Sequence, residues 1–216
     1  MAARRSNDCC LWREALVLFT AILLLVTFSG VAADDSPAPM QSPIWIQDPW
    51  TGDSVLAIVN EPDYSLWNGA RIEDYEHAIA VEAPPPLGIL SIESVNIQVP
   101  IYNGTDEFTL DRGAGRIRGM AKTGEEGNLG ISGHRDGFFR SIKDIQVGDD
   151  IVVQTTHGVV KYAVSDITIV PKEDESVLVE TADKRLTLVT CYPFYFVGNA
   201  PKRYIVTAMP RTLSLE

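Results

Sequence analysis

The sequence contains few cysteines, and their positions exclude an internal disulfide in most of the chain. Of its three cysteines, Cys9 and Cys10 precede a long apolar run and only Cys191 follows it. If the part after that run is exported, it carries one unpaired thiol into an oxidising compartment. A reactive thiol, a bridge to another molecule or simple burial would each explain such a residue.

Positive charge is also scarce, since 18 Lys and Arg stand against 29 Asp and Glu, for a net charge of −11. Such an acidic chain has no electrostatic attraction to nucleic acid, so nucleic-acid binding is not expected. No cysteine and histidine have the spacing of zinc ligands. The acidic clusters at 125–126 and 173–175 lack the ligand spacing of a calcium loop. We therefore predict no metal and no cofactor, with a hard cation at these clusters as the lesser alternative.

One long stretch lacks charge altogether. No charged residue lies between Ala15 and Ala33, and three arginines precede this run. As a helix it is roughly 28 Å long at about 1.5 Å per residue, close to the hydrocarbon thickness of a bilayer. Residues 1–33 are therefore predicted to be a single-pass anchor in the cytoplasmic membrane, with the remainder outside. The run 31–33 also fits a signal-peptide cleavage site, which leaves removal of this segment as the alternative.

Two segments separate this anchor from the folded domain. Residues 34–62 mix serine, proline, aspartate and glycine with two tryptophans and are predicted to be a linker leading away from the membrane. Residues 63–83 are predicted to be an amphipathic helix, capped by Asp63 and Ser65 and laid on the domain through about Ala80, with His77 on its exposed face. Its apolar face comprises Leu66, Trp67, Ala70, Ile72, Tyr75 and Ile79.

After the prolines at 84–86 the apolar period changes from helical toward two, so residues 84–216 are predicted to be the folded domain. A short helix and loop are expected at 111–118. Short strands are expected at 87–92, 95–102, 129–133, 150–155, 159–170, 177–180, 186–191 and 203–209. Many short strands with few helices indicate an all-β fold, namely a closed or nearly closed antiparallel barrel.

The strand that ends at Cys191 is the strongest candidate for a site. Residues 186–190 are apolar or β-branched, which is typical of a buried strand. Pro193 cannot donate a ladder hydrogen bond, so the strand is predicted to end at or near Cys191. The thiol would then lie at the rim of the sheet, where a substrate can reach it. A buried and unreactive cysteine is the alternative.

Catalysis by a thiol also needs a proton donor for the leaving group and a group that stabilises the oxyanion. His134 follows the short strand 129–133 and lies among residues typical of an exposed turn. Arg203 opens the last strand, which could pair beside the Cys191 strand through the 195–200 loop. These two side chains are the candidate partners of the thiol.

Other candidates have simpler interpretations. His157 lies in a predicted hairpin turn and is expected to be a surface or structural histidine. Three arginines of the irregular segment are expected in solvent, with the lining of a groove as the alternative. They are Arg112, Arg116 and Arg118.

The motifs at these positions resemble those of sortases. Residues 187–191 fit the TLxTC signature, Gly133-His134 fits the sortase histidine, and Arg203 fits the arginine on the strand after the cysteine strand. From about Ser65 to Arg211 the chain looks like a class D sortase. The similarity also includes the segments 104–105, 110, 115–117, 124–128, 134–140 and 191–194.

This resemblance implies an eight-stranded β-barrel and a cysteine transpeptidase outside the membrane. Cys191 would attack the threonine carbonyl of an LPXTG-like sorting signal on a secreted protein and form a thioacyl intermediate. His134 would protonate the departing amine and deprotonate the incoming one. Arg203 would hold the substrate backbone or the oxyanion, and Thr190 would be a further substrate contact. The acceptor amine would belong to a cell-wall peptide or a protein lysine, so that the secreted protein is attached to the cell envelope.

Two other functions stay open. A cysteine hydrolase would form the same thioacyl intermediate but resolve it with water. A non-catalytic anchored module would bind C-terminal sorting peptides without cleaving them. Papain-like proteases fit poorly because their cysteine precedes their histidine, and L,D-transpeptidases fit poorly because their thiol follows a Ser-His-Gly run that this sequence lacks.

Overall fold

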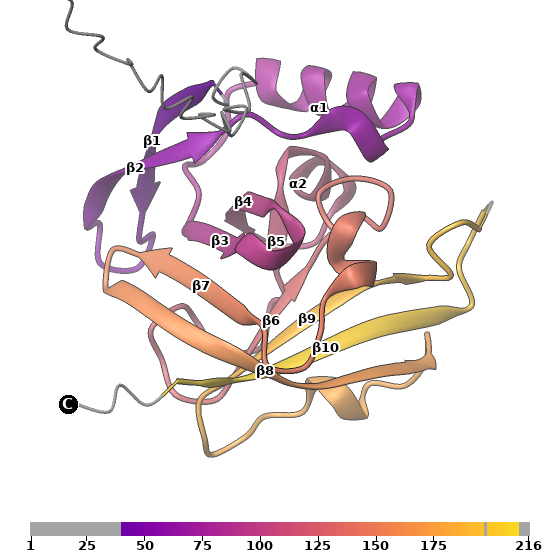
Figure 1. Cartoon of the computed structure of the whole chain (residues 1–216). Helices are drawn as coiled ribbons and strands as arrows, with labels where there is room; N and C mark the ends of the chain where they lie inside the picture. The colour runs from indigo at the N-terminus through magenta and orange to yellow at the C-terminus, as the bar shows by residue number, and fades with distance from the viewer. Residues whose placement is uncertain (1–39, 197, 212–216) are drawn as a thin grey trace, which may run out of the picture. The chain divides into compact units, whose positions relative to one another are not determined.

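The computed structural model describes residues 40–196 and 198–211. Within these residues eight strands close into a barrel, and two further strands form a separate hairpin (Figure 1). The predicted anchor at 1–33 lies outside the described residues. In the part that the structure describes, no helix combines the length and the apolar character needed to cross a bilayer.

The barrel strands neighbour one another in the order β10-β8-β7-β3-β4-β5-β6-β9, and β9 closes onto β10. In chain order they are β3 (Gly88–Ile92), β4 (Ile97–Asn103), β5 (Ala114–Arg116), β6 (Asn128–Ser132), β7 (Asp150–Thr155), β8 (Gly158–Pro171), β9 (Arg185–Tyr192) and β10 (Lys202–Pro210). The eight-stranded barrel is therefore confirmed. The expectation of an antiparallel barrel is wrong for two pairs, because β4 pairs with β5, and β6 with β9, in parallel.

Side chains that alternate along the strands fill the interior of the barrel. The fully buried members of this core include Leu90, Ile92, Val99, Ile101, Ile131, Phe139, Ile151, Leu186, Leu188 and Val206. Leu186 and Leu188 point into this core, so the alternate residues of β9, among them Val189 and Cys191, face the outside of the barrel. The predicted rim position of the thiol therefore lies on the outer face.

Residues 114–116 differ from the sequence prediction, which placed a short helix and loop at 111–118. The helix, α2 (Glu107–Arg112), comes earlier, and residues 114–116 form β5. Gly115 allows this strand to pass close to its neighbour, because a Cβ there would lie 2.0 Å from the Gly104 carbonyl oxygen. The glycine that weakened the sequence signal for a strand is thus the residue that the strand requires.

Residues 177–180 were predicted as a strand but contain a short 3-10 turn, η4 (Ser176–Leu178). The side chain of Asn128 supplies the hydrogen bonds that a partner strand would have made. Its amide donates to the carbonyl oxygens of Val177 and Val179 at 3.3 and 3.1 Å. Because Asn128 binds these backbone carbonyls, residues 177–180 need not pair with a strand of the sheet.

Residues 41–60 form a β-hairpin where the sequence indicated a linker over 34–62. The strand β1 (Gln41–Gln47) pairs antiparallel with β2 (Ser54–Asn60). Ile46 and Ala57 are buried and pack against Ile89 of the barrel strand β3. The polar and proline-rich composition of this segment masks a row of alternate apolar residues, and burial of that row against the barrel stabilises the hairpin.

Asp48 joins the turn of this hairpin to the barrel. Its carboxylate accepts from the N–H groups of Trp50 and Thr51 at 2.7 and 3.1 Å and lies 2.7 Å from Nε2 of His157 in the β7–β8 turn. Burial opposes ionisation of Asp48, but these hydrogen bonds and the nearby imidazole outweigh it and hold the pKa of Asp48 below its usual range. His157 therefore has the structural role that the sequence predicts.

The predicted amphipathic helix begins later than expected. A 3-10 turn, η1 (Tyr64–Leu66), starts at Asp63 and ends in an extended residue. The helix α1 (Gly69–Ala80) then begins with Asn68 as its N-cap, whose side chain accepts from the backbone N–H of Arg71 at 2.9 Å. The break follows from the Asn-Gly pair, since asparagine favours the capping position and glycine disfavours the helix interior.

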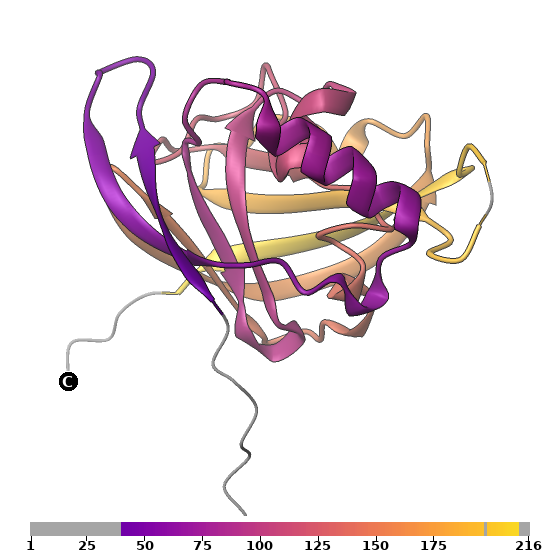
Figure 2. The same ribbon diagram turned by 90° about the horizontal axis from the view of Figure 1, so that it is seen from above.

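The helix α1 lies beside α2 on the outside of the barrel (Figures 1 and 2). Within α1 only Ala78 is fully buried, and Ile79, which was predicted on the packed face, is about half exposed. Trp67 and Tyr75 instead close edge-on against Phe138, with ring centroids 4.9 and 5.7 Å apart. The helix is therefore held mainly against α2 and the loop that follows β6, and His77 is exposed as predicted.

Candidate active site

The predicted site residues come to one rim of the barrel on three neighbouring strands. The parallel strands β6 and β9 stay in register at their ends, where the N–H of Gly133 donates to the Val189 carbonyl at 3.2 Å. The hydroxyl of Thr190 donates to the Gly133 carbonyl at 2.7 Å. His134 follows Gly133 and Cys191 follows Thr190, so the register of β6 and β9 brings His134 and Cys191 to the same position on the rim.

Arg203 approaches this rim on β10. It is the antiparallel partner of Cys191, and directly opposed residues present their side chains on the same face of a sheet. Its guanidinium donates to the carbonyls of Ala200 and Lys202 at 3.3 and 3.0 Å and makes no ion pair with a described residue. The predicted pairing of the last strand with the Cys191 strand is confirmed, and Arg203 retains N–H donors for a ligand.

Thr190, which the resemblance implies as a further substrate contact, has a buried side chain. Its side chain is only 2 % exposed, and its hydroxyl is already bound to the Gly133 carbonyl. The Thr190 side chain thus joins β9 to the residue before His134, and its contact with a substrate stays a prediction.

Gly133 and Phe139 together fix the turn that carries His134. A Cβ at Gly133 would lie 2.8 Å from the ring of Phe139, which is fully buried in the core. The N–H groups of Gly137 and Phe139 both donate to the His134 carbonyl at 3.2 Å. The turn is thus closed by its own backbone and anchored in the barrel by one aromatic ring.

Two arginines tie this turn to the loop that follows Cys191. Arg135 and Arg140 donate to backbone carbonyls at distances of 2.6 to 3.1 Å. The acceptors are Pro193, Phe196 and Gly198 for Arg135, and Phe194 for Arg140. Both arginines were included in the family resemblance without a role. No local pattern identifies such contacts, because the acceptors lie 54 to 63 residues away in sequence.

His134 is largely buried, with 18 % of its side chain exposed. Its Nε2 lies 3.5 Å from a carboxylate oxygen of Glu107 and 3.5 Å from one of Asp111, both on α2. Burial lowers the pKa of His134 and the charge of Arg71 lowers it further, while Asp111 and more distant aspartates oppose this shift. The neutral imidazole is therefore favoured.

The three groups at the rim complement one another chemically. Cys191 offers a nucleophile, His134 can take up and release a proton, and Arg203 offers N–H donors to a developing oxyanion. Cys191 is half-buried on the outer face of the barrel, where an extended peptide can reach it. This arrangement is suited to acyl transfer through a thioester.

The side chains around His134 also have the composition of a metal site. One ligand atom each from Glu107, Asp111 and His134 lies within 4.8 Å of the others. Asp111, however, is already ion-paired with the guanidinium of Arg71, which supplies the positive charge there. We therefore assign no metal to this group.

Three carboxylates of the acidic clusters found in the sequence lie beside lysines. Glu125 pairs with Lys122 at 3.2 Å and Glu126 with Lys184 at 3.4 Å. Glu173 lies 3.7 Å from its neighbour Lys172. These three carboxylates thus each have a lysine partner, whereas Asp174 accepts a hydrogen bond from the backbone N–H of Ser176.

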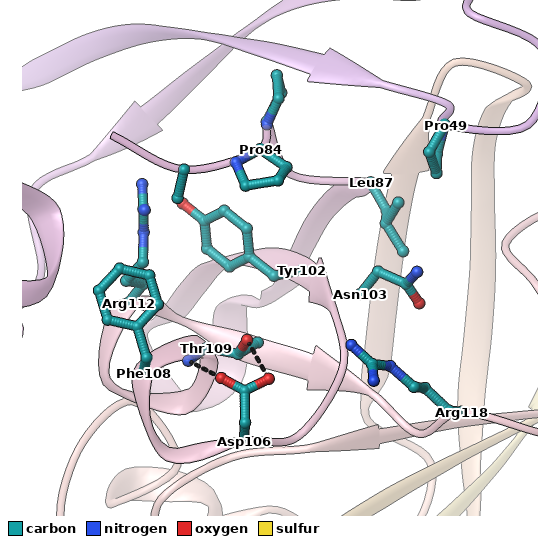
Figure 3. Close-up of a pocket in the computed structure, with 12 residues that line it drawn as sticks. Pro49, Pro84, Leu87, Tyr102, Asn103, Asp106, Phe108, Thr109, Arg112 and Arg118 are labelled. Atoms are coloured by element: carbon teal, nitrogen blue, oxygen red, sulfur yellow. Dashed lines mark hydrogen bonds between the residues drawn. The ribbon is translucent and has the colours of Figure 1, made fainter. Parts of the chain in front are cut away.

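A cavity of about 400 Å³ adjoins a different face of α2, and none of the three rim residues lines it (Figure 3). Arg112 lies over the rings of Tyr102 and Phe108, at 5.2 and 5.4 Å from their centroids. Arg118 lines the same cavity, so the groove-lining alternative is right for both arginines. Arg116 instead is buried and donates to backbone carbonyls near the end of β5.

Comparison with known proteins places these features in a family. The profile of the sortase domain matches residues 90–211. The protein "Sortase D" of Bacillus subtilis (strain 168) is 40 % identical over 120 residues, which cover 55 % of this chain and 61 % of that relative. This chain spans about half to three fifths of the length of the curated relatives it matches.

Solved structures agree with this match. A Clostridium perfringens Sortase D5 transpeptidase superposes with a TM-score of 0.55 and 27 % identity, over 65 % of this chain and 89 % of that one. The catalytic domain of B. anthracis SrtD gives a TM-score of 0.52 and 29 % identity, over 61 % of this chain and 90 % of that one. The matched region contains β6, β9 and β10, and with them all three rim residues.

Proposed function

The chain belongs to the sortase family, and on this basis we propose that it is a membrane-anchored cysteine transpeptidase of the class D type. It cleaves an LPXTG-like C-terminal sorting signal after the threonine and transfers the threonine carbonyl to an amine. The acceptor is a cell-wall peptide or a protein lysine, so the secreted protein becomes attached to the cell envelope. The strand register that brings Cys191, His134 and Arg203 to one rim carries this proposal.

The reaction proceeds in two steps at the Cys191 sulfur. His134 takes the thiol proton of Cys191 as the Sγ atom attacks the threonine carbonyl carbon, and it gives this proton to the departing amine as the carbon–nitrogen bond to the next residue breaks. The acceptor amine then attacks the thioester carbon, His134 takes its proton, and the carbon–sulfur bond breaks. Arg203 donates hydrogen bonds to the oxyanion formed in each step.

The proposed location follows from the sequence. The uncharged run before Asp34 holds the chain in the cytoplasmic membrane, and its basic flank leaves the catalytic domain on the outer side. There the enzyme meets secreted proteins and envelope amines. Expression of the full chain and protease treatment of intact cells tests this orientation, which requires that the domain be accessible from outside.

Transfer to an amine is tested with the full chain in detergent micelles. An LPXTG-containing peptide with a fluorophore and quencher is supplied with and without triglycine, and the products are identified by mass spectrometry. The proposal predicts a peptide joined through its threonine to triglycine. If cleavage occurs but only the free threonine acid forms over a range of amines, the protein is a cysteine hydrolase instead.

The non-catalytic alternative is tested in cells that co-express a protein with a sorting signal. A transpeptidase requires Cys191→Ala to abolish processing of that protein. Unchanged processing in this variant would assign the chain to binding of sorting peptides.

A further inference from the structure

We propose that Arg71 of α1, acting through Asp111 of α2, is a positioning residue for His134. A helix outside the residues matched by the family profile, which begin at position 90, would then complete the active site. The inference rests on the proposed function for its catalytic meaning. Its geometry stands independently, because it concerns which side chains surround the imidazole.

The ion pair between Arg71 and Asp111 is the centre of this arrangement. Nη1 of Arg71 contacts Oδ1 of Asp111, and the same carboxylate oxygen lies 3.5 Å from Nε2 of His134. The Arg71 and Asp111 side chains are only 12 % and 14 % exposed, so solvent screens their interaction little. A buried arginine thus holds the carboxylate that faces the imidazole.

Arg71 also contacts the His134 turn directly. A Cβ at Gly137 would lie 3.4 and 3.6 Å from two carbons of the Arg71 stem and 3.6 Å from the His134 Cβ. Nε of Arg71 lies 3.4 Å from a carboxylate oxygen of Asp136 in the same turn. The arginine therefore bridges α2 and the turn, so its position and that of His134 are coupled.

The aromatic cluster described above keeps α1 in place for this role. Trp67 and Tyr75 pack on Phe138, which lies one residue after Gly137. The Asn68 cap fixes the first turn of the helix, where Arg71 is located. Arg71 is therefore presented by a helix terminus that is anchored on the loop it serves.

Several charged and titratable groups face His134 from the elements around it. Arg71 and Asp74 come from α1, Glu107 and Asp111 from α2, and Asp136 from its own turn. The strands β9 and β10 carry Cys191 and Arg203 at the same rim of the barrel. Among the carboxylates, Asp111 is the least exposed of those paired in this network. Among the charged side chains, Arg71 and Asp111 therefore have the largest and opposite effects on the pKa of His134.

This balance gives the two residues effects of opposite sign. Loss of the Arg71 charge removes a repulsion of the imidazolium and leaves Asp111 without its cation, so the pKa of His134 rises. Loss of the Asp111 charge removes an attraction, so the pKa of His134 falls. If the pair had a purely structural role, the pKa of His134 would shift in the same direction in both variants or would not shift.

The experiment measures the His134 pKa by NMR in the full chain in detergent, labelled with 13C-histidine. The chain has three histidines, and His77→Gln and His157→Gln assign their resonances. Arg71→Gln is expected to raise the His134 pKa, Asp111→Asn to lower it, and Arg71→Lys, which keeps the charge, to restore it. The titrations of His77 and His157 serve as internal controls and should not change.

Kinetics supply the second measurement. Because a misplaced catalytic group costs on the order of 10- to 100-fold in rate, Arg71→Gln is expected to lower kcat/KM to that extent and to move its pH profile upward. Arg118→Gln is the matched control, since Arg118 is exposed and makes no hydrogen bond or ion pair with a described residue. Its kcat/KM should equal that of the unsubstituted chain.

The outcomes separate this inference from the proposed function. Unmoved or parallel His134 titrations in Arg71→Gln and Asp111→Asn would overturn the inference even if the enzyme transfers peptides normally. Opposite shifts in a protein that cleaves no sorting peptide would support the inference and contradict the proposed function. If Arg71→Gln does not fold, Arg71→Lys and Asp111→Asn still test the inference. Asp111→Asn should lower the His134 pKa, whereas Arg71→Lys should leave it unchanged.

Discussion

Two histidines of this protein each lie beside an aspartate, in very different settings. His157 meets Asp48 at 2.7 Å, where the turn of the β1–β2 hairpin touches the β7–β8 turn, and 42 % of the His157 side chain is exposed. His134 meets Asp111 at 3.5 Å beside Cys191, and only 18 % of its side chain is exposed. The first pair fastens a hairpin, while the second lies at the proposed site of catalysis.

The surroundings of the two aspartates explain the difference. Backbone N–H groups of Trp50 and Thr51 satisfy Asp48, and its pKa is lowered despite burial. Burial raises the pKa of Asp111, and the neighbouring Arg71 and His134 only partly oppose this. The hydrogen-bonded carboxylate of Asp48 stabilises the fold, whereas the buried ion pair of Asp111 with Arg71 lies close enough to His134 to influence the pKa of its imidazole.

The largest expected effect separates the two histidines themselves. His134→Ala should lower kcat/KM by about 10²- to 10⁴-fold, as loss of a general acid and base does. His157→Ala should leave kcat/KM unchanged and lower only the melting temperature. Both are measured with the fluorogenic peptide and by thermal unfolding. Equal losses of activity in the two variants would show that His134 has no catalytic role beyond that of His157.

Arg203, like His134, is expected to affect activity rather than stability. Arg203→Ala should lower kcat/KM by about 10²- to 10³-fold, because an oxyanion loses its donor. The fold should persist, since the guanidinium binds only nearby backbone carbonyls. The circular dichroism spectrum checks folding, and a near-normal rate would exclude Arg203 from the mechanism.

Asp48, like His157, is expected to affect stability rather than activity. Asp48→Ala removes the acceptor of two backbone N–H groups and the partner of His157, which should cost about 1–3 kcal/mol in the free energy of unfolding. Urea denaturation measures this cost. Activity per folded molecule should be unchanged, because the hairpin packs on β3 rather than at the rim.

The smallest effect concerns acid stability. Because the pKa of Asp48 is lowered from its usual 3.8, its contribution is present above that value and is lost as the pH falls through the lowered pKa. Melting temperatures of the unsubstituted chain and of Asp48→Asn should therefore differ at neutral pH and converge in acid. A difference that stays constant with pH would show that Asp48 acts without its charge.

Much of the barrel was predictable from the sequence, because its strands carry a local signal. The strands β7 to β10 lie within a residue or two of the predicted ranges, since their apolar residues alternate with a period of two. The hairpin at 41–60 and the strand β5 escaped prediction. The apolar residues of the hairpin lie in a segment rich in turn-forming residues, and β5 is short and contains small residues, so contact with other strands decides both.

Some residues of the candidate site were likewise predictable from the sequence, and others were not. The family resemblance indicated Cys191, His134 and Arg203, and the strand register brings them together. Arg71 and Asp111 were not predicted, because neither carries a motif and the two lie 40 residues apart. The resemblance implied that Thr190 contacts the substrate, and the burial of its side chain follows from the alternation along β9. Such roles depend on tertiary contacts, which spacing along the chain does not encode.

The most direct test of the account is the intact mass of the full chain after it is mixed with a sorting peptide in the absence of amine. We expect a covalent adduct equal to the peptide up to its threonine, located on Cys191 by fragmentation and absent from Cys191→Ala. Triglycine should remove the adduct and yield the transfer product. Cleavage of the peptide by Cys191→Ala at the rate of the unsubstituted chain would contradict the assignment of Cys191 as the nucleophile.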